Sequence, residues 1–180
     1  TATPEQSPTP GHITNPQSEI QRLRRLAARE QWEQLLTDTK SYLRQFPNVE
    51  RQAANELLYE AYLNIGIQQV EGSTPELGLY YLEQAEELKA LPLEAEEYRF
   101  WASLYLQGIS FYGVNWDASA YYFRDLCLSA PFYQNACSLL GEVLVSYGDQ
   151  LAISQDWCPA QQVYQEARQQ VNSGTLHTTL

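Results

Sequence analysis

The chain has 180 residues, of which 44% are hydrophobic and 18% are charged, a composition typical of one folded domain with its own core. Its net charge of −11 excludes the basic surface that nucleic-acid binding requires, and it disfavours contact with an anionic membrane. No apolar run reaches about 18 residues, so we expect no direct membrane insertion.

Residues 1–16 predict an extended, Thr/Pro-rich linker. This segment contains four prolines and four threonines, a composition that forms neither a packed helix nor a central strand. Segments of this kind occur as O-glycosylated spacers, and the alternative is an ordinary disordered tail. The chain also begins at Thr1 and has no methionine, so we expect a processed segment. The candidate glycosylation sites are Thr1, Thr3, Ser7 and Thr9.

A helical pattern begins at residue 17. Asn15 followed by Pro16 is a helix-start signal, and apolar residues then recur at helical spacing until Pro47 ends the pattern. The first helix of this stretch is rich in arginine. It carries Arg22, Arg24, Arg25 and Arg29, which form a candidate basic patch for assembly.

The start of this helical pair recurs along the chain. Trp32, Trp116 and Trp157 each follow a polar residue and open a helix, and "STPELGL" with Pro75 supplies the missing copy. Gly66, Gly108 and Gly148 recur as well, eight or nine residues before the next helix start. The repeats are expected at 17–47, 49–92, 93–131 and 132–172. Prolines close the first three copies, and "NSG" at 172–174 is expected to cap the fourth.

These features predict an all-α fold, an α-solenoid of four stacked antiparallel helical hairpins over residues 17–172, followed by a tail at 173–180. The hairpin pattern resembles the tetratricopeptide-repeat (TPR) family. Small residues in the first helices, alanines in the second helices (Ala85, Ala120 and Ala167) and the closing prolines carry the likeness. The resemblance implies a superhelix with a concave groove for protein binding, and no family functional residue is transferred.

The three cysteines bear on the cellular compartment of the protein. Cys127 and Cys137 flank Pro131 ten residues apart, so they form either a disulfide between two helices or two small buried thiols. A disulfide implies an extracytoplasmic protein, whether periplasmic, cell-surface or secreted. Cys158 is then either free and buried or paired with another chain. Without a CxxC motif or a nearby histidine, we expect no zinc site.

The residues suggest no reactive centre. His12 and His177, the only histidines, lie in the predicted tails, and no glycine-rich phosphate loop is present. The one acidic cluster is interpreted as a solvated rim, because it lacks the spacing of a calcium site or a hydrolytic carboxylate pair. We therefore expect no catalytic residue, no cofactor, no metal and no enzyme activity. The cluster contains Glu83, Glu86, Glu87, Glu94, Glu96 and Glu97.

Aromatic residues are concentrated between positions 80 and 123, where most are expected in the core between repeats. Two adjacent pairs stand out as candidate partner contacts: Tyr80 with Tyr81, and Tyr121 with Tyr122. Neighbouring side chains point about 100° apart on a helix, so we expect one ring of each pair to be more exposed. A weaker hypothesis assigns these rings to sugar binding or catalysis.

Two functions remain open. The first is a protein–protein interaction scaffold, tethered by its Thr/Pro stalk and engaging a protein partner. The second is a structural subunit that stacks end to end into an extracellular filament. Residues 1–51 carry a net charge of +1 and the remainder −12, which favours complementary ends. The lack of an obvious capping helix after residue 172 also favours the filament.

Overall fold

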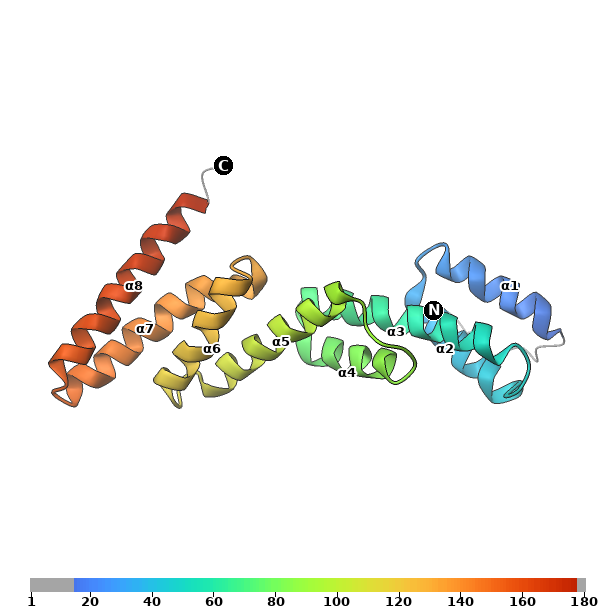
Figure 1. The fold of residues 1–180 in the computed structure, drawn as a ribbon, viewed down its shortest axis with the longest axis horizontal. Coiled ribbons are helices and arrows are strands. Elements are labelled where there is room, and N and C mark those ends of the chain that lie inside the picture. Colours follow the sequence, from blue (N-terminus) through green and yellow to red (C-terminus); the bar gives the residue numbers. More distant parts are fainter. Residues whose placement is uncertain (1–14, 178–180) are drawn as a thin grey trace, which may run out of the picture. The chain divides into compact units, whose positions relative to one another are not determined.

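The computed structural model describes residues 15–177, with side chains up to residue 170 (Figure 1). All regular structure in this range is helical, which confirms the all-α prediction. The elements are α1 (Pro16–Ala27), α2 (Trp32–Gln45), α3 (Arg51–Glu71), α4 (Pro75–Glu86), α5 (Leu93–Phe111), α6 (Trp116–Ser129), the short 3₁₀ turn η1 (Tyr133–Asn135), α7 (Ala136–Ile153) and α8 (Trp157–His177).

Local sequence explains where these helices begin. The Asn15 side chain accepts hydrogen bonds from the backbone N–H groups of Gln17 and Ser18, at 3.0 and 3.3 Å, and so caps α1. Asn115 caps α6 in the same way through the N–H of Ala118, at 3.1 Å. The expected first residues are therefore confirmed for the second helix of every pair: Trp32, Pro75, Trp116 and Trp157.

Two predicted boundaries in the last helix pair are wrong. The helix expected from Phe132 begins at Ala136, because Gln134 and Asn135 adopt left-handed backbone angles (φ 46° and 56°) that interrupt it. At the other end, α8 continues to His177 instead of stopping at 172–174. A glycine commonly ends a helix by adopting a left-handed backbone, whereas Gly174 remains helical.

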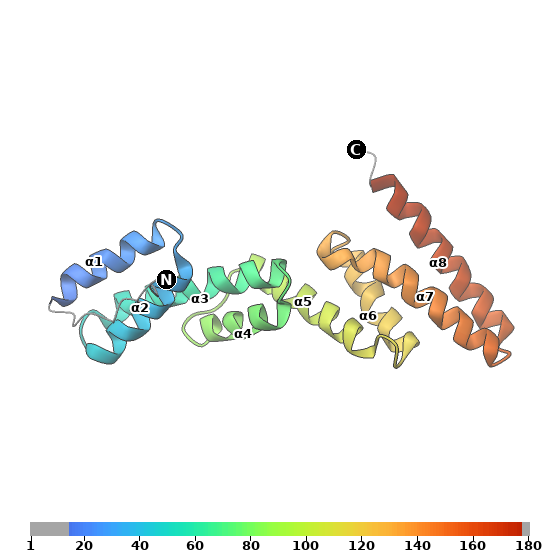
Figure 2. The same ribbon diagram turned by 180° about the vertical axis from the view of Figure 1, so that it is seen from behind.

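Consecutive helices lie side by side as the pairs α1–α2, α3–α4, α5–α6 and α7–α8, as both ribbon views show (Figures 1 and 2). In the last three pairs, a glycine of the first helix meets a bulky side chain of the second helix. A Cβ atom on the glycine would come within 3 Å of that side chain, so the contact requires a residue without one. These contacts join Gly66 to Leu82, Gly108 to Phe123 and Gly148 to Tyr164.

In the first pair, a large residue occupies the position that the glycine takes in the other three pairs. Leu23 lies nine residues before Trp32, the distance that separates Gly66 from Pro75 and Gly148 from Trp157. The residue sixteen positions later is the small Thr39, and both side chains are fully buried. In this register, the first pair therefore carries the large residue in its first helix and the small residue in its second.

The chain divides into two compact units. The first contains residues 15–69 and Leu77–Ala95. Its apolar core joins residues from all four of its helices, so α1 to α4 bury their apolar faces against one another. The core residues are Ile20, Leu23, Leu35, Leu36, Tyr42, Ala54, Leu57, Leu58, Ala61, Tyr62, Ile65 and Ala85.

The second unit contains Val70–Glu76 and the residues from Glu96 to the end of α8. The turn before α7 is anchored within this unit. Tyr133 is buried and donates its hydroxyl hydrogen bond to the carbonyl of Val70, at 2.6 Å, while the Gln134 amide donates to the carbonyl of Gly72, at 2.5 Å. These bonds hold the left-handed residues in place and offset their conformational cost.

Candidate interaction surfaces

The tyrosine pair on α4 is split between surface and core. Tyr80 is 50% exposed, whereas Tyr81 is half-buried and lies 6.1 Å, between ring centroids, from Tyr62 of α3. The rings of Tyr80 and Tyr81 meet edge to face, with centroids 5.4 Å apart. The inner ring therefore fixes the outer ring at the surface.

The same arrangement recurs on α6. Tyr121 is 57% exposed and meets Tyr122 edge to face at 5.2 Å, and Tyr122 stacks parallel to Phe111 of α5 at 5.8 Å. Both pairs occupy the sixth and seventh residues of their helices. The expectation that one ring of each pair is more exposed is confirmed.

Each outer tyrosine lies in a stripe with acidic and aliphatic side chains. Helical spacing places Leu77 and Glu83 on the face of Tyr80, Glu87 follows in the turn just after α4, and all three are exposed. We call Leu77, Tyr80, Glu83 and Glu87 the α4 stripe. Asp117, Tyr121, Asp125 and Leu128 form the corresponding α6 stripe, in which Leu128 is 81% exposed. Sequence reasoning identified the tyrosines but missed the carboxylates of the α6 stripe, although Asp117 and Asp125 each lie four residues from Tyr121 in the sequence.

The candidate basic patch on α1 is only partly free. Arg22 forms ion pairs with Glu19 and with Asp38 of α2, both at 2.6 Å. These hydrogen bonds, led by that with Glu19, raise the pKa of Arg22, so this charge stabilises the α1–α2 contact. Arg24, Arg25 and Arg29 are exposed. Arg24 also lines an open groove of about 210 Å³ beside Glu56 and Glu60 of α3.

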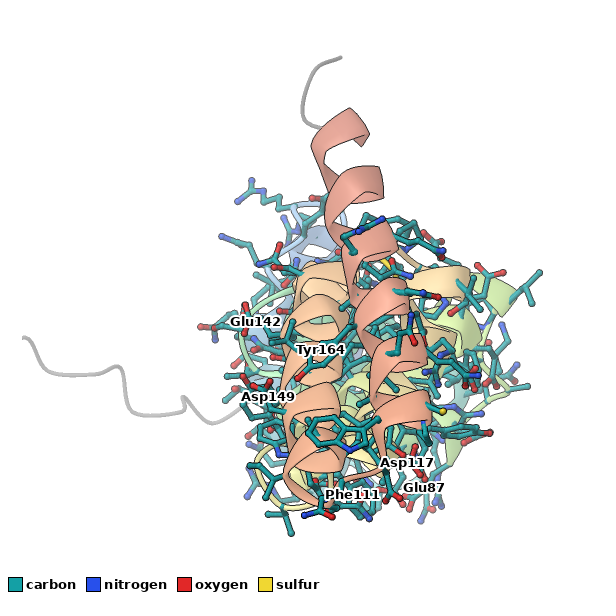
Figure 3. All side chains as sticks on the ribbon, turned by 90° about the vertical axis from the view of Figure 1, so that its left-hand side faces the viewer. Glu87, Phe111, Asp117, Glu142, Asp149 and Tyr164 are labelled. Atoms are coloured by element: carbon teal, nitrogen blue, oxygen red, sulfur yellow. A yellow bond between two sulfur atoms is a disulfide. The ribbon has the colours of Figure 1, made fainter. Side chains whose placement is uncertain are left out.

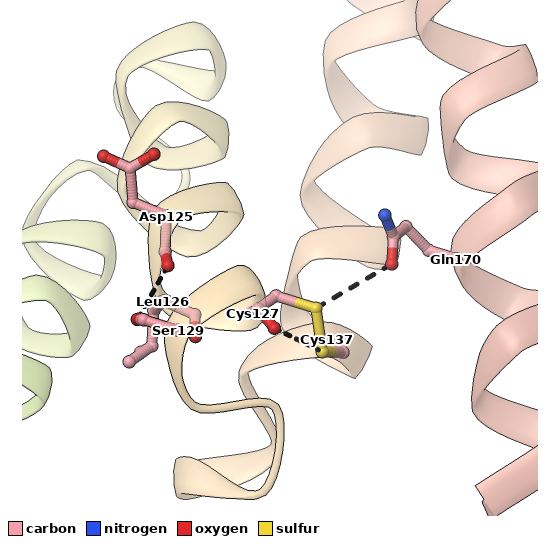
Figure 4. Close-up of a disulfide and its surroundings, with 6 residues drawn as sticks. All are labelled: Asp125, Leu126, Cys127, Ser129, Cys137 and Gln170. Atoms are coloured by element: carbon pink, nitrogen blue, oxygen red, sulfur yellow. Dashed lines mark hydrogen bonds between the residues drawn. A yellow bond between two sulfur atoms is a disulfide. The ribbon is translucent and has the colours of Figure 1, made fainter.

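The structure brings the candidate cysteine pair together (Figure 4). Cys127 at the end of α6 and Cys137 at the start of α7 form a disulfide, with Cα atoms 4.9 Å apart. The sulfur of Cys127 lies 3.8 Å from the side-chain oxygen of Gln170 on α8. Cys158 is free and exposed, so the alternative that placed it in the core is wrong.

A groove of about 470 Å³ runs along α8 in the second unit. Trp157 is 65% exposed there, whereas Trp32 and Trp116, which open their own helices in the same way, are half-buried. Beside it, the Tyr164 hydroxyl donates a 2.5 Å hydrogen bond to Asp149, whose carboxylate raises the pKa of the tyrosine (Figure 3). Ala152, Trp157, Ala160, Gln161, Tyr164, Gln165 and Arg168 line the groove.

The outward face of α8 is polar. The exposed residues there are Gln161, Gln162, Gln165, Arg168 and Gln169. The expected lack of a capping helix after residue 172 remains a prediction, because α8 itself runs through this position to His177.

Most of the acidic cluster lies at the surface. Glu83, Glu86, Glu87, Glu94 and Glu97 are exposed, and Glu96 forms an ion pair with Arg99. Among the described residues, no group of three His, Cys, Asp or Glu side chains could hold a metal ion. No helix in the described range is both long and apolar enough to cross a membrane.

Several sequence predictions fall on residues outside the described range. These are His12 and the candidate glycosylation sites Thr1, Thr3, Ser7 and Thr9. The side chain of His177 also lies outside it. Comparisons with protein-family models, with curated proteins and with solved structures found no match to this chain.

Proposed function

We propose that this chain is a non-catalytic scaffold for protein–protein interaction, built as a TPR-like α-solenoid of four stacked antiparallel hairpins. The close contact between a glycine and a bulky residue supports the repeat, because it recurs in three helix pairs at a separation of fifteen or sixteen residues. Hairpins of this kind bury their apolar faces only by packing on their neighbours, and they leave an extended surface for a partner.

The recurring outer tyrosine is the observation that carries the proposal. Tyr80 and Tyr121 stand at the same position of their helices, each braced by an inner tyrosine and each more than one-third exposed. Tyrosine provides a large, rigid contact surface at low entropic cost and is enriched at protein interfaces. A ring that served only the core would be buried, as Phe123 is in α6.

We further propose that the scaffold acts outside the cytoplasm. The Cys127–Cys137 disulfide supports this location, since such bonds persist in oxidising compartments. The Thr/Pro-rich residues 1–16 would then serve as a stalk between this domain and its anchor point.

Site-specific photo-crosslinking in the native host tests the proposal. A photoreactive phenylalanine analogue replaces Tyr80 or Tyr121, and two matched variants carry it at Thr37 and Gln162, the sixth residues of α2 and α8. We expect adducts with a discrete protein at 80 and 121 and none at 37 and 162. Equal labelling at all four positions, or no protein adduct, would contradict the proposal.

Self-assembly into an extracellular filament, with a glycosylated N-terminal arm, is the second candidate. Exposed Arg25 and Arg29 on α1 favour it, because residues 52–180 carry a net charge of −12. The polar outer face of α8 weighs against end-to-end stacking. Analytical ultracentrifugation of the purified chain from low to high salt distinguishes the two. A monomer of 20.6 kDa throughout excludes the filament.

A further inference from the structure

We infer that the α4 stripe and the α6 stripe each bind arginine side chains, and that a protein partner presents these on basic segments. This inference rests on the proposed function and assigns the partner its chemistry. Both stripes combine an exposed tyrosine ring, an exposed leucine and carboxylates within one or two helical turns. Part of the α6 stripe is also engaged within the second unit, because Asp117 accepts a hydrogen bond from the Tyr147 hydroxyl of α7 and the Arg124 guanidinium attracts both Asp117 and Asp125.

The geometry of the stripes suits a guanidinium group. Residues three or four apart on a helix lie about 5–6 Å from each other, which places Glu83 beside the ring of Tyr80. Asp117 and Asp125 lie one turn to either side of Tyr121 by the same spacing. An arginine can stack its planar group on the ring while it donates paired hydrogen bonds to the carboxylate, and lysine lacks this combination.

The chain already uses this chemistry internally. The Lys40 ammonium lies 4.9 Å from the ring centroid of Tyr62, and that of Lys89 lies 5.2 Å from the centroid of Tyr59. Arg124 of α6 pairs with Glu166 of α8 through two hydrogen bonds, at 2.8 and 3.1 Å. Within the described residues, no cation lies over Tyr80 or Tyr121. The two outer rings therefore remain free for a cation from another molecule.

Charge favours a foreign partner over a second copy. Two copies at a net charge of −11 each repel one another, whereas a basic segment is attracted over the range of the Debye length. The chain's own arginine patch is also partly occupied, because Arg22 is paired with Glu19 and Asp38. The partner segment is thus expected to carry arginines at a spacing that matches one helical turn.

Binding of defined peptides to the full chain tests this inference. The probes are three alanine-based helical peptides with arginine, lysine or glutamine at every fourth position. We expect affinity in the order arginine, lysine, glutamine, and we expect the arginine peptide to bind more weakly as salt rises. The double variant Y80A/Y121A should weaken arginine-peptide binding about tenfold, and E83Q/E87Q should weaken it severalfold.

The variant T37A/Q162A changes the same register in α2 and α8 and should leave peptide binding unchanged. Circular dichroism shows whether each variant remains folded, and exposed rings tolerate truncation better than core rings. Absent peptide binding, or equal binding of all three peptides, would overturn the inference. An equal loss of peptide binding in the control variant T37A/Q162A would also overturn it. The same holds if the wild-type chain self-associates and the variant Y80A/Y121A is a monomer. Protein adducts at Tyr80 and Tyr121 without arginine preference would overturn only this inference and leave the scaffold intact.

Discussion

The α5–α6 and α7–α8 pairs of the second unit share one internal contact and differ at their surfaces. Each pair brings a glycine of the first helix against an aromatic ring of the second, Phe123 in one case and Tyr164 in the other. Phe123 is completely buried, whereas Tyr164 is only half-buried and bonds to Asp149. The helix contact therefore recurs while the chemistry around it varies.

The outer positions differ more. The sixth and seventh residues of α6 are Tyr121 and Tyr122, whereas those of α8 are Gln162 and Val163. Trp116 packs edge to face on Tyr112 at 5.2 Å, whereas Trp157 is mostly exposed beside a groove. Residues that face the partner helix maintain the fold, and residues at the surface distinguish one repeat from the next. This difference is why we place binding on α6 and not on α8.

Loss of the disulfide that joins the two pairs should have the largest effect. The double variant C127S/C137S frees a ten-residue loop, which should lower the free energy of unfolding by about 2–3 kcal/mol. Chemical denaturation under non-reducing conditions measures this change. The variant C158S removes the free, exposed cysteine and should leave stability unchanged. Mass mapping that found Cys127 and Cys137 both open to alkylation would contradict the bond.

The shared helix contact is broken most directly at Gly108. The Cβ atom of G108A would lie 2.9 Å from the buried ring of Phe123, which has no room to move, so we expect a loss of about 1–3 kcal/mol. G141A in α7 is the control, because a Cβ atom there meets nothing within 4 Å. That change should stabilise the chain by up to about 1 kcal/mol through helix propensity. Thermal and chemical denaturation compare the two, and equal effects would refute a close contact at Gly108.

The two tryptophans sharpen the surface comparison. W116A removes a half-buried ring and should cost about 2 kcal/mol, whereas W157A removes a ring that is 65% exposed and should cost less than about 1 kcal/mol. Denaturation curves for the two variants give the difference directly. A larger loss from W157A would mean that the α8 groove is filled in solution, and the exposure of Trp157 would then be the wrong description of this surface.

The hydrogen bond that anchors the turn before α7 to Val70 should weaken at high pH. Burial raises the pKa of Tyr133 above its ordinary value of 10.0, so the folded chain retains a proton that the unfolded chain releases. Stability is therefore full below pH 10 and falls as the pH rises above it, by about 1.4 kcal/mol per pH unit for this group. Y133F loses the bond to Val70, at a cost of about 1 kcal/mol, but its stability should fall less steeply. Urea denaturation between pH 9 and about 11 measures how the free energy of unfolding falls with pH in the wild type and in Y133F. Equal slopes in the two proteins would exclude Tyr133 as the source of the pH dependence.

Sequence patterns predicted the helices well where local chemistry decides the outcome. Asn15 with Pro16 and Asn115 with Trp116 fix helix starts through capping bonds that involve only neighbouring residues. The recurring glycines pointed to the repeat for the same reason, since a close helix crossing requires a small residue at a set place. The split of each tyrosine pair into an outer and an inner ring also followed from helical geometry alone.

Features that depend on distant contacts were not visible in the sequence. The late start of α7 depends on Tyr133 and Gln134 reaching residues 70–72, more than sixty positions away. The exposure of Trp157 follows from what lies against its helix, while its sequence context matches that of Trp116. For the candidate surfaces, the tyrosines could be predicted from the sequence. The exposure of the leucines and the ion pairs of Arg22 became visible only in the structure.

The glycine contacts also bear on how such a chain could arise. The glycine is the same in three helix pairs, yet its partner is leucine, phenylalanine or tyrosine in turn. A duplicated segment of about forty residues would inherit the close contact between its two helices. The bulky residue of the second helix could then be replaced by another large residue. Under such a duplication, the first pair would be the most divergent copy, because the large Leu23 and the small Thr39 occupy its equivalent positions.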